Sequence, residues 1–281
     1  RVRLLEEAGI TFKCNVEVGK DITKNELDQQ YDAIIVCTGA EKARDLPLEG
    51  RMGQGIHFAM DYLTEQTQLL LGELDTQTIT AKGKKVVVIG DGDTGADCVA
   101  TALRDGCDSI VQFNRKARKP ERFEMNYSWP LAQPVLKKDY AHQEYEAKYG
   151  QEPRAYGIQT MRFDLDGNGN VRGIYAQVQQ DRADGTIVGD DREIFIPADL
   201  VLLAIGFEGV EPRLAHALNL KVERQKIAAD TKDYQTNQAK YFAAGDARRG
   251  QSLVVWAIKE GREVAASVHQ FINEKSFVSF L

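Results

Sequence analysis

Apolar runs separated by polar, glycine-containing turns predict a chain in which strands and helices alternate. Strands are predicted where apolar and often β-branched residues follow one another, at residues 11–18, 31–37, 84–89, 109–113, 199–207 and 241–246. Helices are predicted at residues 2–8, 24–30, 61–71, 96–103, 140–149 and 253–271. The alternation predicts an α/β fold.

Two stretches break this alternation. Residues 157–197 resemble antiparallel strands, and residues 72–83 are polar and turn-rich, so we interpret them as a linker. Residues 164–170 resemble a calcium-binding loop, but the twelfth position from Asp164 is Tyr175 where such a loop requires Glu. The Asp-Gly and Asn-Gly pairs within the stretch favour a β-hairpin turn.

The strand at residues 84–89 leads directly into Gly90-Asp91-Gly92-Asp93-Thr94-Gly95 and then into a helix. A G-x-G-x-x-G turn in this strand–turn–helix context predicts a dinucleotide site. The first glycine permits the tight turn, the second allows a pyrophosphate to approach, and the third brings helix and strand together. The alternative is a glycine-rich turn that binds no ligand.

The end of the next strand indicates which dinucleotide binds. An NAD site carries Asp or Glu there, whereas this chain has Asn114 followed by the cations Arg115, Lys116, Arg118 and Lys119. Because cations suit a 2′-phosphate, we predict NADP(H). The alternative is a solvated basic loop. Asp91 must point away from the pyrophosphate, or it weakens binding.

Three further strands also end in glycine. They lead into Thr38-Gly39, Gly206 and Gly245-Asp246, and α/β ligands bind at such strand ends. Asp246 precedes the long helix at residues 253–271, so it either accepts hydrogen bonds from a ligand hydroxyl or caps a helix.

Composition narrows the class of protein. The 281 residues suffice for about two domains, and the net charge of −6 predicts no nucleic-acid partner. No apolar run is long enough to span a bilayer, so we expect no membrane partner. The cysteines include no C-x-x-C pair, which fits a reducing cytoplasm and gives no metal site. The four histidines are scattered, and we expect them to be surface or packing residues. Because the chain starts with Arg1 in helix-like sequence, we expect that a preceding segment is missing.

Three segments together resemble one family: KKVVVIGDGDTGADC, ADLVLLAIGF and YFAAGDARRGQSLVVWAIKEGREVA. They are similar to the small (β) subunit of NADPH-dependent bacterial glutamate synthase. The wider group is the thioredoxin-reductase-like flavoproteins, which have two dinucleotide-binding domains. The resemblance covers nearly the whole chain.

The resemblance implies two cofactor sites and no catalytic side chain. NADPH would bind at Gly90, Gly92, Asp93, Thr94 and Gly95, with its 2′-phosphate beside Asn114, Arg115, Lys116 and Arg118. FAD would bind at Gly245 and Asp246, with Gln251, Ser252, Leu253 and Val254 near its ring, and Thr38, Gly39 and Gly206 at the crossovers. The protein would position the two rings for hydride transfer.

The family also implies a route for the electrons and a division into domains. Electrons would leave through iron–sulfur clusters to a large subunit that makes glutamate from glutamine and 2-oxoglutarate. The cluster cysteines and the first FAD glycine motif would precede this segment, so this chain alone is expected to be inactive. We predict an NADPH-binding Rossmann-like domain at residues 81–206, inserted in an incomplete FAD-binding domain at residues 1–80 and 207–281.

Two alternatives remain open. One is a reductase of the same architecture with another electron acceptor, similar to ferredoxin:NADP reductase or to dihydropyrimidine dehydrogenase. The other is a non-catalytic NADP-binding module that docks onto a partner through residues 116–156, which include Trp129.

Overall fold

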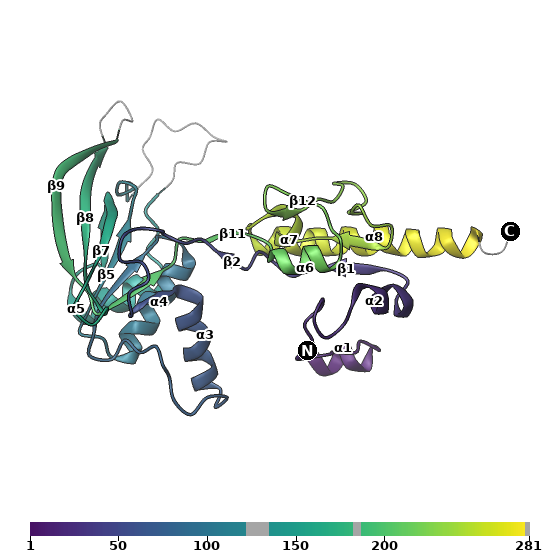
Figure 1. Ribbon diagram of the computed structural model, residues 1–281, viewed down its shortest axis with the longest axis horizontal. Coiled ribbons are helices and arrows are strands. Elements are labelled where there is room, and N and C mark those ends of the chain that lie inside the picture. Colours follow the sequence, from purple (N-terminus) through teal and green to yellow (C-terminus); the bar gives the residue numbers. More distant parts are fainter. Residues whose placement is uncertain (122–134, 182–186, 279–281) are drawn as a thin grey trace. The chain divides into compact units, whose positions relative to one another are not determined.

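The computed structural model describes residues 1–121, 135–181 and 187–278 (Figure 1). The chain divides into two compact units, one formed by Arg1–Ala43 with Phe207–Leu281 and the other by Arg44–Gly206. The second unit is therefore inserted in the sequence of the first. We call them the outer unit and the inserted unit.

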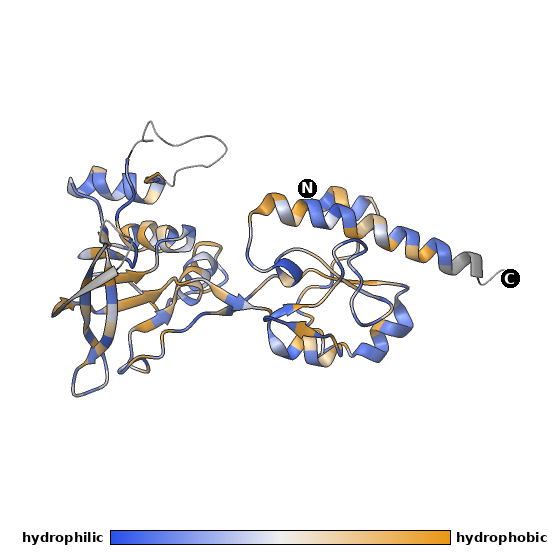
Figure 2. Ribbon diagram, turned by 90° about the horizontal axis from the view of Figure 1, so that it is seen from above, coloured by the Kyte–Doolittle hydropathy of each residue, from blue (hydrophilic) through white to orange (hydrophobic). Residues whose placement is uncertain are grey.

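The inserted unit is built on a five-stranded parallel sheet. Its strands, in spatial order, are β3 (Ile56–Phe58), β10 (Leu200–Leu203), β4 (Lys85–Ile89), β5 (Ser109–Asn114) and β6 (Arg154–Tyr156). Helices α3 (Ala59–Leu70), α4 (Asp93–Asp105) and α5 (Tyr140–Tyr149) pack against one face. Side chains alternate along β4: Val86 and Val88 join the helices, whereas Val87 and Ile89 join the opposite core. Both faces are covered, which explains why the central strands β4 and β10 are almost entirely apolar (Figure 2).

The opposite face is covered by an antiparallel sheet of β7 (Ile158–Leu165), β8 (Val171–Asp181) and β9 (Ile187–Pro197). The predicted hairpin turn is confirmed, because β7 and β8 pair on either side of it. The Asp166 carboxylate accepts hydrogen bonds from the backbone N–H groups of Asn168 and Asn170, at 2.8 and 2.9 Å, which closes the turn.

The outer unit has a smaller set of strands. β1 (Ile34–Val36) pairs in parallel with β14 (Tyr241–Ala243), β2 (Lys42–Ala43) with β11 (Phe207–Gly209), and β12 (Val222–Glu223) with β13 (Lys226–Ile227). Its helices are α1 (Val2–Glu7), α2 (Lys24–Gln30), α6 (Pro212–Ala217), α7 (Asp246–Arg249) and α8 (Val254–Val278). The predicted strand at residues 11–18 is wrong, because Asn15 adopts φ +57° and interrupts the extended run.

The domain boundary predicted at residue 80 also differs from the boundary in the structure, which lies between Ala43 and Arg44. Residues 44–80 belong to the inserted unit, where β3 and α3 join the parallel sheet and its helices. The predicted linker is exposed at residues 72–76, but its second half is packed: Ala81 is fully buried, and the Asp105 carboxylate accepts a hydrogen bond from Thr80 at 3.0 Å. Polar composition hid these contacts, because the segment packs through its backbone and side-chain hydroxyls.

Candidate nucleotide site

The glycine turn lies at the carboxyl end of β4, where the chain enters α4. Gly90 has φ +130°, and a Cβ at this position would meet the Ala204 carbonyl oxygen at 2.1 Å. Only glycine fits both the conformation and this close approach. Gly92 is the N-cap of α4 and has no side chain to satisfy the first N–H groups of the helix. These N–H groups are therefore available to an anion.

The third glycine is buried and holds α4 against the turn. A Cβ on Gly95 would lie 2.6 Å from the Gly90 carbonyl oxygen and 2.7 Å from Nε2 of Gln112. The sequence prediction that this glycine brings helix and strand together agrees with these distances.

A cavity of about 620 Å³ lies over the turn and is lined by residues of the inserted unit alone. It brings together seven of the predicted cofactor residues: Gly90, Gly92, Thr94, Asn114, Arg115, Lys116 and Gly206. Asp91 also lines it and is exposed. The cavity therefore joins the glycine turn to the basic segment after β5, as a dinucleotide requires.

The basic end of the cavity combines a buried amide with two exposed cations. Asn114 is 7% exposed, and its Oδ1 accepts a hydrogen bond from the backbone N–H of Lys116 at 3.0 Å. Arg115 and Lys116 are exposed, and within the described residues neither side chain has a carboxylate partner within 4.0 Å. They can therefore meet an anionic ligand without first breaking an ion pair with another described residue.

Three predicted nucleotide residues lie away from the cavity lining: the buried Gly95 and the exposed Arg118 and Asp93. Arg118 forms an ion pair with Glu121 at 2.7 Å and lies 3.8 Å from Glu152. Asp93 is in the first turn of α4, with its side chain 94% exposed and 3.7 Å from Lys137 Nζ. Both engage other partners, unlike Arg115 and Lys116.

The sequence missed the residues that complete the cavity from outside the strand–turn–helix segment. These are chiefly Arg44, Leu46, Leu48, Ile158 and Thr160. The hydroxyl oxygen of Thr160 is buried and has no hydrogen-bond partner among the described residues, so it is available to a ligand. No local signal marks these residues, because they reach the cavity only through the tertiary packing of the inserted unit.

In the outer unit, the predicted FAD residues follow two paired strands. β1 and β14 are parallel, with Val36 opposite Ala243, so the Thr38-Gly39 and Gly245-Asp246 segments leave the same edge. The Ser252 hydroxyl donates a hydrogen bond to Asp246 at 3.2 Å, which joins the two FAD segments predicted near α7 and α8.

The start of α8 presents apolar side chains to solvent. Gln251 and Ser252 are exposed, and Leu253, Val254 and Val255 are 70%, 71% and 59% exposed. Figure 2 shows the hydrophobic beginning of this helix. Consecutive exposed apolar residues of this size are unusual on a free surface and suit contact with a planar ring or another protein segment.

A parallel sheet with a glycine-rich turn and a cavity at its carboxyl edge defines a nucleotide-binding α/β protein. The chain matches the pyridine nucleotide-disulphide oxidoreductase family over residues 3–151 and 157–261, and it belongs to that family. The predicted α/β class and flavoprotein group are thereby confirmed.

Relatives in this family agree with the resemblance to glutamate synthase. The chain is 46% identical to the Bacillus subtilis glutamate synthase [NADPH] small chain, over 98% of this chain and 57% of that protein. It is 41% identical to glutamate synthase [NADH] of Schizosaccharomyces pombe, over 99% of this chain and 14% of that protein. The chain thus spans little more than half of the bacterial small chain.

Solved structures share the fold. Mycobacterium tuberculosis FprA in complex with NADPH superposes with a TM-score of 0.67 at 17% identity, covering 94% of this chain and 69% of that one. Thioredoxin reductase from T. acidophilum superposes with a TM-score of 0.55 at 19% identity, covering 85% of this chain and 65% of that one.

No helix in the described part of the chain is long and apolar enough to cross a membrane. Trp129, which belongs to the docking surface only in the alternative of a non-catalytic module, falls outside the described residues.

Proposed function

We propose that the chain binds NADPH in the cavity of the inserted unit and serves the reductase reaction of a glutamate synthase small chain. The observation that carries this proposal is the cavity itself, which joins the helix-start turn at Gly90 and Gly92 to the cations Arg115 and Lys116. The turn supplies N–H groups for a pyrophosphate, and the cations supply charge for a third phosphate.

Preference for NADPH over NADH rests on the end of β5. A carboxylate there would accept a hydrogen bond from the ribose 2′-hydroxyl and repel a 2′-phosphate. Asn114 occupies this position, and its oxygen is already used by the Lys116 backbone. The relatives differ in their nucleotide, since the B. subtilis protein is an NADPH enzyme and the S. pombe protein an NADH enzyme. The choice between NADPH and NADH therefore rests on the charges beside the end of β5 in this chain.

The outer unit has residues that suit a flavin. Gly245 and Asp246 would hold the ribityl chain, with Gln251, Ser252, Leu253 and Val254 beside the ring and Thr38-Gly39 on the neighbouring strand end. The exposed apolar start of α8 and the polar Asp246–Ser252 pair fit a ligand with a flat apolar ring and a hydroxylated chain. When bound, the flavin supplies the acceptor for the hydride of NADPH.

In the whole protein, electrons would pass onward to a large subunit that forms glutamate, with iron–sulfur clusters held elsewhere in the complex. The names of the relatives support this destination. Within this chain, the residues named above bind and orient the two cofactors, and we assign no side chain as acid or base.

The test is calorimetric titration of the chain with NADPH and with NADH at fixed moderate salt. We expect NADPH to bind at least about tenfold more tightly, a difference of about 1.4 kcal/mol. Arg115→Ala should abolish the preference. Arg118→Ala is the matched control, because Arg118 is paired with Glu121 and lies off the cavity lining.

Equal affinity for the two nucleotides in the unmodified chain would refute the 2′-phosphate assignment. Binding of neither nucleotide would refute the proposal that this chain binds NADPH by itself. An equal loss of preference in Arg118→Ala would show that general surface charge, rather than the cavity, sets the specificity.

A further inference from the structure

Buried polar side chains connect α5 to the glycine turn. Gln112 on β5 is fully buried, and its Nε2 donates a hydrogen bond to the Gly90 carbonyl oxygen at 2.8 Å. Its Oε1 lies 2.8 Å from Nε2 of His142, which is on α5 and 3% exposed. A fully buried amide in a strand requires such partners, because an unpaired buried amide is costly.

The partners fix where the protons lie. A carbonyl oxygen only accepts hydrogen bonds, so the amide nitrogen of Gln112 must face Gly90 and its oxygen must face His142. That oxygen also only accepts, so His142 must carry a proton on Nε2. The donor direction therefore runs from His142 through Gln112 to Gly90.

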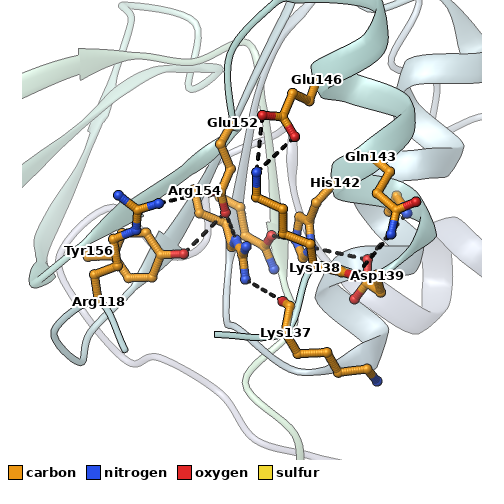
Figure 3. A network of polar contacts seen from close by, with 12 residues as sticks. Arg118, Lys137, Lys138, Asp139, His142, Gln143, Glu146, Glu152, Arg154 and Tyr156 are labelled. Atoms are coloured by element: carbon orange, nitrogen blue, oxygen red, sulfur yellow. Dashed lines mark hydrogen bonds and ion pairs between the residues drawn. The ribbon is translucent and has the colours of Figure 1, made fainter. Parts of the chain in front are cut away.

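The other ring nitrogen faces a carboxylate. Nδ1 of His142 lies 3.1 Å from Oδ1 of Asp139 and has no hydrogen-bond partner in the described chain (Figure 3). The same Oδ1 accepts from the backbone N–H of Ala141 at 3.2 Å and caps α5. Asp139 thereby fixes the start of the helix that carries His142.

Charges of both signs surround the ring. Burial, the largest cause, lowers the pKa of His142, and Arg154 and Lys138 lower it further, whereas Asp139 and Glu152 raise it. The neutral ring with its proton on Nε2 is therefore the form that the fold favours at neutral pH.

We propose that Gln112 and His142 are positioning residues for the nucleotide turn, a role that rests on the nucleotide binding proposed above. One amide group supports both sides of the turn: it bonds to the Gly90 carbonyl and stands 2.7 Å from where a Cβ on Gly95 would lie. His142 holds that amide in the only orientation that can donate to Gly90. We call Gln112 and His142 together the relay. The relay thus holds the backbone turn that would receive the pyrophosphate, although neither residue lines the cavity.

Substitutions of Gln112 and His142 can distinguish a role in positioning the turn from a role in packing alone. Gln112→Met removes both hydrogen bonds with little change in volume, and His142→Leu removes the donor that orients Gln112. His142→Gln is the rescue variant, because its amide can restore a donor without titrating. Tyr145→Phe is the matched control: this buried tyrosine also joins α5 to β5, through a 3.3 Å bond to the Ile110 carbonyl that does not reach the turn.

Two measurements are made on the whole chain. Amide hydrogen exchange of the peptide covering residues 87–96 reports on the turn without nucleotide, and calorimetry gives the affinity for NADPH. We expect Gln112→Met and His142→Leu to speed exchange in this peptide and to weaken NADPH binding about tenfold. His142→Gln should recover most of both losses, and Tyr145→Phe should change neither.

The outcomes distinguish the relay from the proposed function. If Gln112→Met and His142→Leu match Tyr145→Phe in exchange and affinity, the relay is overturned and the two residues are packing residues only. If the unmodified chain binds no NADPH, the proposed function fails, and the exchange measurement alone still decides whether the relay holds the turn. Faster exchange that His142→Gln does not reverse would refute the part assigned to His142.

Discussion

Glu260 on α8 is the buried carboxylate that holds the predicted flavin loop in place. It is 2% exposed, and its Oε2 accepts hydrogen bonds from the Gly245 backbone N–H at 2.9 Å and from Arg248 Nε at 3.1 Å. Its other oxygen lies 3.2 Å from Arg249 Nε. One carboxylate thus neutralises two guanidinium groups and ties the loop to the long helix.

The magnitude follows from what Glu260→Gln removes. The change keeps the volume and an acceptor for Gly245, but it leaves Arg248, whose side chain is 13% exposed, without its counter-charge. Breaking a buried ion pair from one side costs about 3–5 kcal/mol. We expect about 3 kcal/mol, at the lower end of that range, because the amide oxygen still accepts a hydrogen bond. The matched control is Glu263→Gln. This 43% exposed side chain lies 3.6 Å from Lys259 and accepts a hydrogen bond from the Tyr234 hydroxyl, which an amide oxygen can still accept, so the change should cost under about 1 kcal/mol.

The assay must report on the outer unit alone, because a protein of two units need not unfold in one step. The chain has two tryptophans, so a Trp129→Phe background leaves Trp256 on α8 as the only indole. With a urea m-value of about 1–3 kcal/mol/M, the midpoint followed by Trp256 fluorescence should fall by about 1–3 M. A fall no larger than that of Glu263→Gln would refute the reasoning.

Two further predictions concern the inserted unit. Gly95→Ala should destabilise it by about 1–3 kcal/mol in urea unfolding, because the new Cβ would press against Gly90 and Gln112. The control is Gly92→Ala, whose Cβ meets no atom within 4 Å; it should cost under about 1 kcal/mol, the loss expected for alanine at an N-cap. Equal effects of the two changes would contradict the packing argument. Burial lowers the pKa of His142 from 6.5. The contribution of the neutral His142 ring to the free energy of unfolding should therefore be complete above about pH 6.5 and should be lost as the pH falls through the lowered pKa. His142→Gln should reduce that loss in urea midpoints measured across this range, and an unchanged pH dependence would contradict the assignment.

The sequence predicted the elements whose signals are local. The apolar run at residues 85–89, the glycine turn and the following helix are consecutive, so their pattern is complete within one short segment. The basic residues Arg115 and Lys116 were identified for the same reason, since they directly follow the neighbouring strand.

Tertiary structure decided which distant segments complete the site. Leu46 and Leu48 lie outside every element predicted from the sequence, yet they line the cavity, and the predicted linker packs beside Asp105. His142 was expected to be a surface or packing residue, and only its burial beside Gln112 shows a link to the turn. The periodicity of apolar residues, the glycine turn and the local charge all depend on neighbours in the sequence. These local features determined which class of site was predicted. Cavity lining, burial and hydrogen-bond partners depend on contacts between residues far apart in the chain, and only the packed sheets and helices establish them.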